Sequence, residues 1–405
     1  MSEDLTEATC NLVRDIALKQ EPTLKKITAF LTSSTMFLTF ALSVAYAAEP
    51  IRIGAIISST GPASFLGEPQ GITLRHYVKK INDAGGVLGR PIELIIYDDA
   101  TDANTARTFA ARLVDSNKVV AAMGPSTTGI TLAVASVFVD AKIPLVSLAA
   151  GVEIVEPVRP YVFKTPHTDR MVCGKTIEDL KVRGIQRIAM INGTDGAGKT
   201  LRNECTAAAK GAGIEILADE TFNPTDSDMT PQLTKIKNRP GVDALLVGGF
   251  GQALALVTRN YGQLGMKVPM YQAHGAASKA YIKLSGTASD GVRLVAPLLV
   301  VGEKLPNTDP SKKVVLDYDK TIRSITGAEA STFGGYSYDA LMLIVNAIER
   351  AKSADPKDIR DALESTQGFV GVTGVFNMSK TDHLGIDARS LYMVDIKNGD
   401  WFVKP

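Results

Sequence analysis

The sequence predicts an α/β protein built from two doubly wound domains. Short apolar runs typical of buried strands alternate with helix-period segments along nearly the whole chain, which excludes an all-β protein and a helical bundle. This alternation builds a parallel sheet once in the first half and again in the second. A chain of 405 residues is also too long for one compact core. Two domains are therefore expected.

The first domain begins with an apolar strand at 51–57, followed by the turn SSTGP at 58–62, whose hydroxyl groups can cap a helix. The next expected elements are helix 67–84, strand 91–97, helix 102–116, a strand from 119, helix 130–140 and strand 143–147. By the right-handed crossover rule, this series forms a doubly wound sheet.

The second domain is expected after an extended stretch at 158–167 that carries two prolines. Its elements are helix 169–183, strand 187–192, helix 199–212, strand 214–219, strand 243–247, helix 252–264 and strand 268–271. The sheet is thus predicted to be built a second time.

The last third of the chain predicts a return to the first domain and then to the second. An apolar segment at 292–300 and a polar one at 302–310 suit a crossing. Helices at 311–325, 336–351 and 356–364 have no strands between them, whereas strands at 371–376, 390–396 and 401–403 end the chain, the last two joined by a hairpin turn. We expect lobe 1 at 50–167 plus 299–366 and lobe 2 at 168–298 plus 367–405, joined by a three-segment hinge.

Residues 1–47 are interpreted as a leader that contains a secretory signal peptide. Lys25 and Lys26 precede an uncharged stretch at 27–48, which ends in the small-residue sequence AYAA, and cleavage is expected after Ala47. A membrane anchor is the alternative, but the polar residues at 32–35 and the small-residue end favour cleavage. The sequence therefore predicts export to the periplasm.

Charge, histidines and cysteines narrow the classes of function. The net charge of +1 gives no general argument for binding nucleic acid. Four scattered histidines show no metal-ligand spacing, so neither a metal nor a cofactor is expected. Cys10 belongs to the leader, and Cys173 and Cys205 fall on helices that flank strand 187–192. A single disulfide is possible there, but the sequence leaves it open.

Two loops rich in small polar residues follow neighbouring strands. The sequence GPSTTG at 124–129 supplies Ser126, Thr127 and Thr128, and IPLVSLAAG at 143–151 ends in Ala149, Ala150 and Gly151. Because the carboxyl ends of parallel strands meet at one sheet edge, these amides and hydroxyls can converge on an anion. The alternative, which this stretch alone leaves open, is that the hydroxyls only cap the next helix.

The sequence GTDGAGKT at 193–200 matches a phosphate-binding loop between a predicted strand and a predicted helix. No later strand ends in a convincing magnesium-binding carboxylate, so we treat a nucleotide-binding enzyme as a remote alternative. The sequence GPSTTG has one residue too many for a nucleophile elbow. The chain is therefore not expected to be an enzyme.

Six motifs together resemble the periplasmic solute-binding proteins of ABC importers, of the type that binds branched-chain amino acids. They are IGAIISSTGP at 53–62, INDAGGVLGRPI at 81–92, the pair Asp98-Asp99, GPSTTG at 124–129, IPLVS at 143–147 and YDA at 338–340. The resemblance covers 51–405 and implies a type I periplasmic binding protein fold with two Rossmann-like lobes that close on a ligand. It also implies an inner-membrane permease as partner, and a monomer is expected.

The resemblance assigns candidate site residues. Thr128 stands at the family's carboxylate-binding serine, with Ser126 and Thr127 beside it, and Ala149 and Ala150 stand where the family's backbone contacts the ligand. The remaining candidates are Gly151, Asp195, Phe250, His274, Gly275 and Tyr336.

Three of these positions depart from the amino acid binders. The family carries a threonine at Gly151, a tyrosine at Asp195 and, near His274, a glutamate that meets the ligand ammonium. A buried ammonium without a partner is costly. We therefore expect a carboxylate without an α-amino group, such as an aromatic acid. Branched-chain amino acids remain the alternative, because Asp195 could supply the negative charge.

Overall fold

The computed structural model describes residues 49–403, which form a single compact unit with two main sheets. The predicted leader lies outside the described residues. Within 49–403, no helix is long and apolar enough to cross a membrane.

The first sheet is entirely parallel. Its strands, in spatial order, are β2 (Ile92–Asp98), β1 (Ile51–Ile57), β3 (Ala121–Met123), β4 (Leu145–Ser147) and β5 (Val162–Lys164). Strand β5 lies within the stretch read from the sequence only as an extended passage, so the first sheet gains a fifth strand before the chain leaves it. The apolar sequence of β1 suits a central strand covered on both faces.

Helices from two distant parts of the chain cover this sheet. They are α2 (Ser64–Asp83), α3 (Ala103–Asp115), α4 (Thr128–Ala141), α11 (Thr332–Ala351) and α12 (Pro356–Glu364). Helix α3 begins where the Asp102 carboxylate accepts a hydrogen bond from the Thr105 amide at 2.7 Å. Helix α11 packs along α2, so a late part of the chain lies against the first sheet's helices.

The second sheet is mixed. Its strands, in spatial order, are β14 (Asp400–Val403), β13 (Leu391–Lys397), β10 (Arg293–Pro297), β9 (Met270–Gln272), β8 (Ala244–Gly248), β6 (Arg187–Gly193) and β7 (Glu215–Phe222). Strands β10 to β7 run parallel, whereas β13 pairs antiparallel with β10 and with β14. The predicted terminal hairpin is therefore confirmed.

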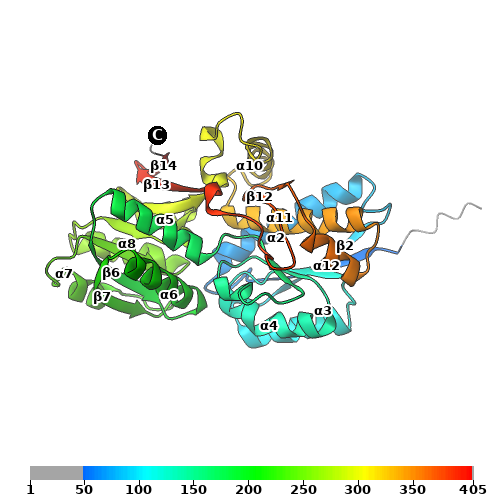
Figure 1. Ribbon diagram of the computed structural model, residues 1–405, viewed down its shortest axis with the longest axis horizontal. Coiled ribbons are helices and arrows are strands. Elements are labelled where there is room, and N and C mark those ends of the chain that lie inside the picture. The colour runs from blue at the N-terminus through cyan, green and yellow to red at the C-terminus, as the bar shows by residue number, and fades with distance from the viewer. Residues whose placement is uncertain (1–48, 404–405) are drawn as a thin grey trace, which may run out of the picture. The chain divides into compact units, whose positions relative to one another are not determined.

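The second lobe carries its own helices, and Figure 1 shows α5, α6 and α8 beside β6 and β7. The helices are α5 (Asp169–Val182), α6 (Gly196–Gly211), α7 (Thr230–Lys237), α8 (Gln252–Gln263) and α9 (Lys279–Ser285). A disulfide joins Cys173 on α5 to Cys205 on α6, with the two Cα atoms 4.8 Å apart. The structure thus answers the question that the cysteine spacing left open.

The chain crosses between the lobes three times. The first crossing leads from β5 into α5, and the second follows β10 and the 3-10 helix η4 (Leu298–Lys304) toward α10 (Lys312–Thr326). The apolar segment at 292–300 is mostly β10, a central strand of the second sheet, as is typical of parallel strands covered on both faces, and the polar segment at 302–310 follows it.

The third crossing lies later than the expected boundary at residue 367. Strands β11 (Phe369–Val370) and β12 (Val375–Phe376) form a short hairpin. In its turn, the amides of Val372 and Thr373 each donate to the Asp339 carboxylate on α11 at 2.8 Å. Further on, the His383 carbonyl accepts from the Lys164 amide of β5 at 3.2 Å. These contacts tie the segment to the first lobe, so the chain leaves it only between residues 383 and 391.

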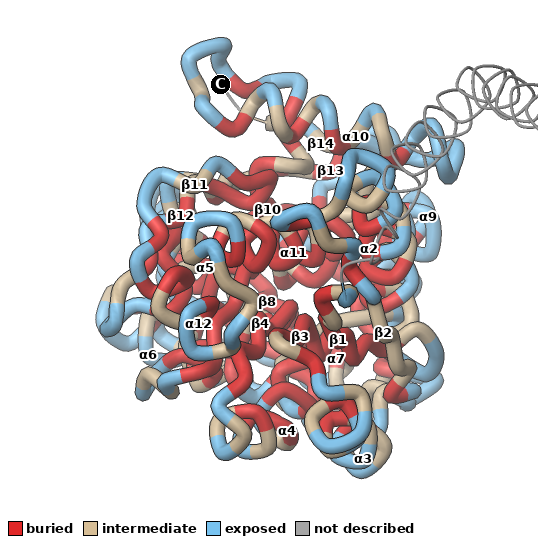
Figure 2. Tube along the Cα trace, turned by 90° about the vertical axis from the view of Figure 1, so that its right-hand side faces the viewer, coloured by how far each residue is buried: buried red, intermediate tan, exposed pale blue. Residues whose placement is uncertain are grey.

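The buried core follows the strands and the inner faces of the helices. Figure 2 shows β3, β4 and β8 largely buried, whereas α3, α6 and α12 carry exposed stretches. The loops at the carboxyl ends of these strands are therefore anchored to closely packed sheets.

Candidate functional site

A small cavity of about 50 Å³ is lined by loops of both lobes. Nine of the eleven candidate residues line it: Ser126, Thr127, Thr128, Ala149, Ala150, Phe250, His274, Gly275 and Tyr336. The structure also brings in residues that the sequence did not single out: Leu66, Leu148, Pro166, Asp169, Ala197, Leu201, Gly249 and Phe333. We call this cavity the ligand pocket. Gly151 and Asp195 are not among its lining residues.

The hydroxyl loop after β3 presents the first turn of α4 to the ligand pocket. Helix α4 begins at Thr128, and the Thr127 side chain at its N-cap makes no capping hydrogen bond among the described residues. The amides of the first helical turn lack intrahelical partners and favour an anion. The alternative that these hydroxyls only cap the helix is therefore wrong for Thr127.

Ser126 has a structural role. Its hydroxyl donates to Gln70 Oε1 at 2.6 Å and accepts from the Ser58 amide at 3.0 Å. Both contacts are buried and hold the loop against α2 and the end of β1. Ser126 lines the ligand pocket, but its hydrogen-bonding capacity is largely used within the first lobe.

Thr128 and Gly151 are coupled. The Gly151 amide donates to Thr128 Oγ1 at 3.1 Å, which leaves the hydroxyl proton of Thr128 available to a ligand. A Cβ added to Gly151 would lie 2.2 Å from Thr128 Cγ2. Glycine is therefore required at 151 because the Thr128 side chain fills the space that a side chain there would need.

Asp169 is the polar group that sequence reasoning missed. It begins α5, its side chain is 1% exposed, and among the described residues neither carboxylate oxygen has a hydrogen-bond partner. Its amide donates to the Ala150 carbonyl at 3.2 Å, which fixes it beside the second anion-binding loop. Burial raises the pKa of the Asp169 carboxyl, and the positive charge of Lys164 opposes that rise.

Lys164 also binds the loop that contains Ala149 and Ala150. It is fully buried, and its ammonium donates to the Ala150 carbonyl at 2.6 Å. Burial lowers the pKa of Lys164, and the nearby Asp169 carboxylate opposes this shift. The two groups are therefore electrostatically linked through Ala150, without a direct ion pair between them among the described contacts.

His274 and Asp169 both belong to the second lobe and lie close together. The Nε2 atom of His274 lies 3.9 Å from Asp169 Oδ1, and Nδ1 is buried with no hydrogen-bond partner among the described residues. Burial lowers the pKa of His274 to about 4, so the imidazole is neutral at pH 7. A neutral imidazole can donate one hydrogen bond and accept another in the ligand pocket.

Asp195, which the sequence offers as a source of negative charge for an amino acid ligand, does not line the ligand pocket. Its carboxylate caps α6 by accepting from the amides of Ala197 at 2.8 Å and Gly198 at 3.1 Å. These are amides that a phosphate-binding loop would offer to a phosphate. The motif at 193–200 is thus the start of α6, and the Asp195 carboxylate occupies amides to which a phosphate would bind. Within 49–403, moreover, no group of three or more His, Cys, Asp or Glu residues is arranged to hold a metal ion.

The remaining wall of the ligand pocket is apolar. Phe250 follows β8 in the second lobe, whereas Phe333 and Tyr336 lie in the first turns of α11 in the first lobe. Leu66 and Leu201 add aliphatic surface from α2 and α6. The pocket therefore combines a polar end near Thr128 and Asp169 with an apolar end.

Comparison with known proteins agrees with this geometry. The profile of a family described as periplasmic binding protein matches residues 50–400. A leucine-, isoleucine-, valine-, threonine- and alanine-binding protein of Pseudomonas aeruginosa is 26% identical over 365 residues, covering 89% of this chain and 91% of the relative.

Solved structures share the fold. An extracellular ligand-binding receptor of Rhodopseudomonas palustris HaA2 has a TM-score of 0.82 and 29% identity, over 88% of this chain and 100% of that one. A branched-chain amino acid transporter substrate-binding protein of Streptococcus pneumoniae, solved with isoleucine, has a TM-score of 0.77 and 24% identity, over 87% of this chain and 98% of that one. The second likeness concerns the fold alone.

Proposed function

Because the chain belongs to the periplasmic binding protein family and is a ligand-binding protein rather than an enzyme, we propose that it captures an α-amino acid with an apolar side chain between its lobes. One observation carries this proposal. Asp169 is a buried carboxylate with no hydrogen-bond partner in the part of the chain that the structure describes, and it lies directly beside Ala150 in the loop predicted to bind a carboxylate.

The two charges of an α-amino acid are attached to one carbon atom, so a site for it needs an anion-binding and a cation-binding group side by side. The first turn of α4, the Thr128 hydroxyl and the loop at Ala149 and Ala150 can receive the carboxylate. Asp169 can then receive the ammonium. A buried unpaired carboxylate is costly, and a bound ammonium removes that cost.

The apolar end of the ligand pocket supports a hydrophobic side chain. Leu66, Leu201 and Phe333 offer no polar groups there. The pocket is small, at about 50 Å³, which favours side chains of modest size. Relatives named as leucine-, isoleucine- and valine-binding proteins are consistent with this class.

An aromatic acid without an amino group is the second candidate. The rings of Phe250, Phe333 and Tyr336 around the pocket favour it. Such a ligand would bring a carboxylate toward Asp169 with no cation between them, and therefore requires Asp169 to be protonated. The raised pKa of Asp169 makes this protonation accessible near neutral pH. The amino acid needs no such step, which is why we prefer it.

The proposed setting is the periplasm. The predicted signal peptide at 1–47 supports export, and the family supports delivery of the ligand to an ABC permease in the inner membrane. The disulfide between Cys173 and Cys205 suits an oxidising compartment. We propose that the mature protein acts as a monomer.

Titration calorimetry on ligand-free protein tests the proposal. The probes are leucine, isoleucine, valine, 4-methylpentanoate, which is leucine without its amino group, and 4-hydroxybenzoate. The Asp169→Asn variant is expected to bind leucine roughly 30-fold or more weaker, because truncating one partner of a buried charge pair costs about 2 to 5 kcal/mol. The same variant should bind 4-methylpentanoate as well as the wild type or better.

Asp195→Asn is the control, because Asp195 is a partly buried carboxylate at the start of another helix of the second lobe and lies outside the ligand pocket. It should leave leucine affinity unchanged. Binding of 4-hydroxybenzoate but of no amino acid would reject the proposal in favour of the second candidate.

A further inference from the structure

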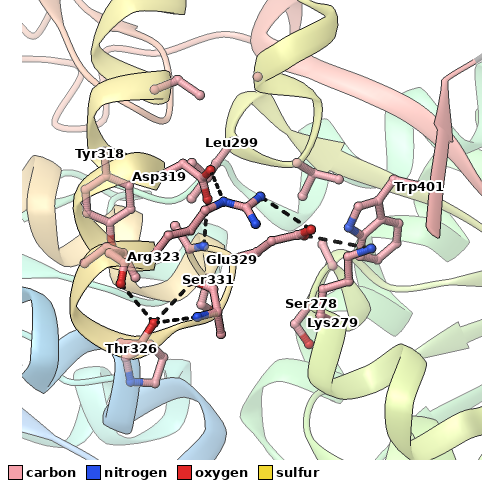
Figure 3. Close-up of a pocket in the computed structure, with 18 of the residues that line it drawn as sticks. Ser278, Lys279, Leu299, Tyr318, Asp319, Arg323, Thr326, Glu329, Ser331 and Trp401 are labelled. Carbon is pink, nitrogen blue, oxygen red and sulfur yellow. Dashed lines mark hydrogen bonds and ion pairs between the residues drawn. The ribbon is translucent and has the colours of Figure 1, made fainter. Parts of the chain in front are cut away.

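A second, larger cavity adjoins the ligand pocket. Its volume is about 480 Å³, compared with about 50 Å³ for the ligand pocket. Its lining comes from α2, α9, η4, α10 and β14, and Figure 3 shows several of its charged side chains. We call it the outer cavity. The two cavities share no lining residue.

One aromatic side chain stands between them. Phe65, in the first turn of α2, lines the outer cavity. Its ring lies 6.3 Å from that of Phe250, nearly parallel at 17°, and 5.4 Å from that of Phe333, at 89°. Both partner rings line the ligand pocket. These three rings therefore form a partition between the two cavities, with Phe65 on the side of the outer cavity.

The partition is assembled from both lobes. Phe65 and Phe333 belong to the first lobe and Phe250 to the second, so the layer is complete only when the lobes lie together as they do here. The backbone next to Phe250 fits the Phe65 ring closely, since a Cβ on Gly251 would lie 3.1 Å from Phe65 Cε1. Gly251 also has φ of +82°, a conformation that favours glycine.

We propose that Phe65 determines the length of ligand that the protein accepts. This rests on the proposed function, because it concerns the apolar end of the same ligand pocket. Phe65 closes that end against the outer cavity and admits side chains that stop at the Phe250 and Phe333 rings. A shorter side chain at position 65 removes the support behind the Phe250 and Phe333 rings, which can then move aside for longer ligands.

The outer cavity can accommodate the end of such a ligand. Arg323 pairs with Asp319 at 2.6 Å, and Glu329 lies 3.8 Å from Lys279 and 3.4 Å from Arg323 (Figure 3). Lys279 also pairs with Asp400 at 2.5 Å. These groups are partly exposed and therefore hydrated, unlike the apolar end of the ligand pocket. A chain that passes position 65 would enter a wet, charged space.

A length series measures the effect. Ligand-free wild type, Phe65→Ala and Phe65→Tyr are titrated with norvaline, norleucine, 2-aminoheptanoate and 2-aminooctanoate, and with the four straight-chain acids that lack the amino group. The wild type should lose at least ten-fold in affinity at one step of the series. Phe65→Ala should move that step to chains longer by two carbons or more, whereas Phe65→Tyr keeps the ring and should behave as the wild type.

Each outcome decides a different statement. If Phe65→Ala still binds short ligands and loses affinity at the same chain length as the wild type, Phe65 does not determine ligand length. The proposed function is then unaffected. Binding of the acids alone refutes the amino acid proposal, while the position of the step still tests Phe65. If neither series binds any of the proteins, both statements fall. Phe65→Leu, which shortens the wall without emptying it, repeats the test with a shift of one carbon if Phe65→Ala unfolds.

Discussion

Gly129 and Gly196 meet backbone to backbone between the two lobes. A Cβ added to Gly196, at the start of α6, would lie 2.8 Å from the Gly129 nitrogen and 3.0 Å from its Cα at the start of α4. Contacts this short leave no room for a methyl group. The observed approach of the lobes therefore depends on glycine at 196, a residue of the motif that resembles a phosphate-binding loop.

Gly196→Ala should oppose closure and weaken ligand binding. The added methyl group must displace backbone rather than a flexible side chain, so we expect affinity to fall by about ten-fold, roughly 1.4 kcal/mol. Calorimetry measures the affinity, and small-angle X-ray scattering with ligand present measures closure. Gly211→Ala is the control, because it lies on the same helix with nothing within 4 Å of the added Cβ. Equal affinities for both variants would contradict a closure contact at Gly196.

Thr128→Val should weaken any ligand that carries a carboxylate. The substitution removes the hydroxyl that accepts from Gly151 and has a proton to donate, and a hydrogen bond to a charged group contributes roughly 1.5 to 3 kcal/mol. Calorimetry with the best ligand of the wild type measures the change. Thr108→Val, on the exposed face of α3, is the control. If affinity does not change, the Thr128 hydroxyl serves only to hold Gly151.

Loss of the disulfide should destabilise the second lobe. Cys173 and Cys205 are 32 residues apart in the sequence, and closing a loop of that length contributes about 3 to 4 kcal/mol in the chain-entropy treatment. Urea unfolding of the wild type with and without reductant should show this difference. A variant with both cysteines replaced by alanine should have the stability of the reduced protein, and reductant should not change it. Because both helices belong to one lobe, ligand affinity should change little.

Asp339 should make stability depend on pH. Burial raises the pKa of this fully buried carboxyl to about 7 in the folded protein, whereas the value in the unfolded chain is about 3.9. Between these values the folded state holds a proton that the unfolded state has released. The contribution of Asp339 is therefore greatest below about pH 4 and is lost as pH rises toward 7, with a slope of at most roughly 1.4 kcal/mol per pH unit.

Asp339→Asn isolates that contribution. Buried His167 and His274 have lowered pKa values, so they contribute stability that is lost as pH falls and oppose the trend in the wild type. Subtracting the urea-unfolding free energies of the variant from those of the wild type at pH 4 to 8 cancels the histidines. A difference that does not vary with pH would show that Asp339 stays ionised, held by the amides of Val372 and Thr373.

Periodicity predicted most strands well, but the strand expected at 371–376 is wrong, because residues 371–374 form the turn of the short hairpin of β11 and β12. The glycine-rich helix starts were predicted poorly. Strand β1 was predicted at 51–57 and lies at Ile51–Ile57, because a continuous apolar run has few alternatives to a buried strand. Helix α11 begins at Thr332 rather than near 336, since its first turns contain Gly334 and Gly335. Glycine argues against helix locally, but close packing on α2, where a Cβ on Gly334 would meet Thr73 Oγ1 at 2.8 Å, requires it.

The ligand pocket shows where a single sequence stops being informative. Thr128, Ala149 and His274 could be assigned because they follow predicted strands and match family positions. Asp169 escaped notice because an acidic residue in the first turn of a helix is ordinary helix chemistry. Its burial and its contact with Ala150 depend on how β4, β5 and α5 meet, which is a tertiary property. Asp195 misled for the converse reason, since one of its carboxylate oxygens caps α6 and its side chain does not line the ligand pocket.

The late segments of the chain impose an order on its folding during synthesis. The first lobe lacks α11 until residue 351 has been made, and β10 lacks its antiparallel neighbour until β13, at Leu391–Lys397, has followed. Domains that are continuous in sequence can fold one after another as they emerge. Here the first lobe is complete only after residue 383 and the second only after β13 and β14, so nearly the whole polypeptide must be available before both cores are complete.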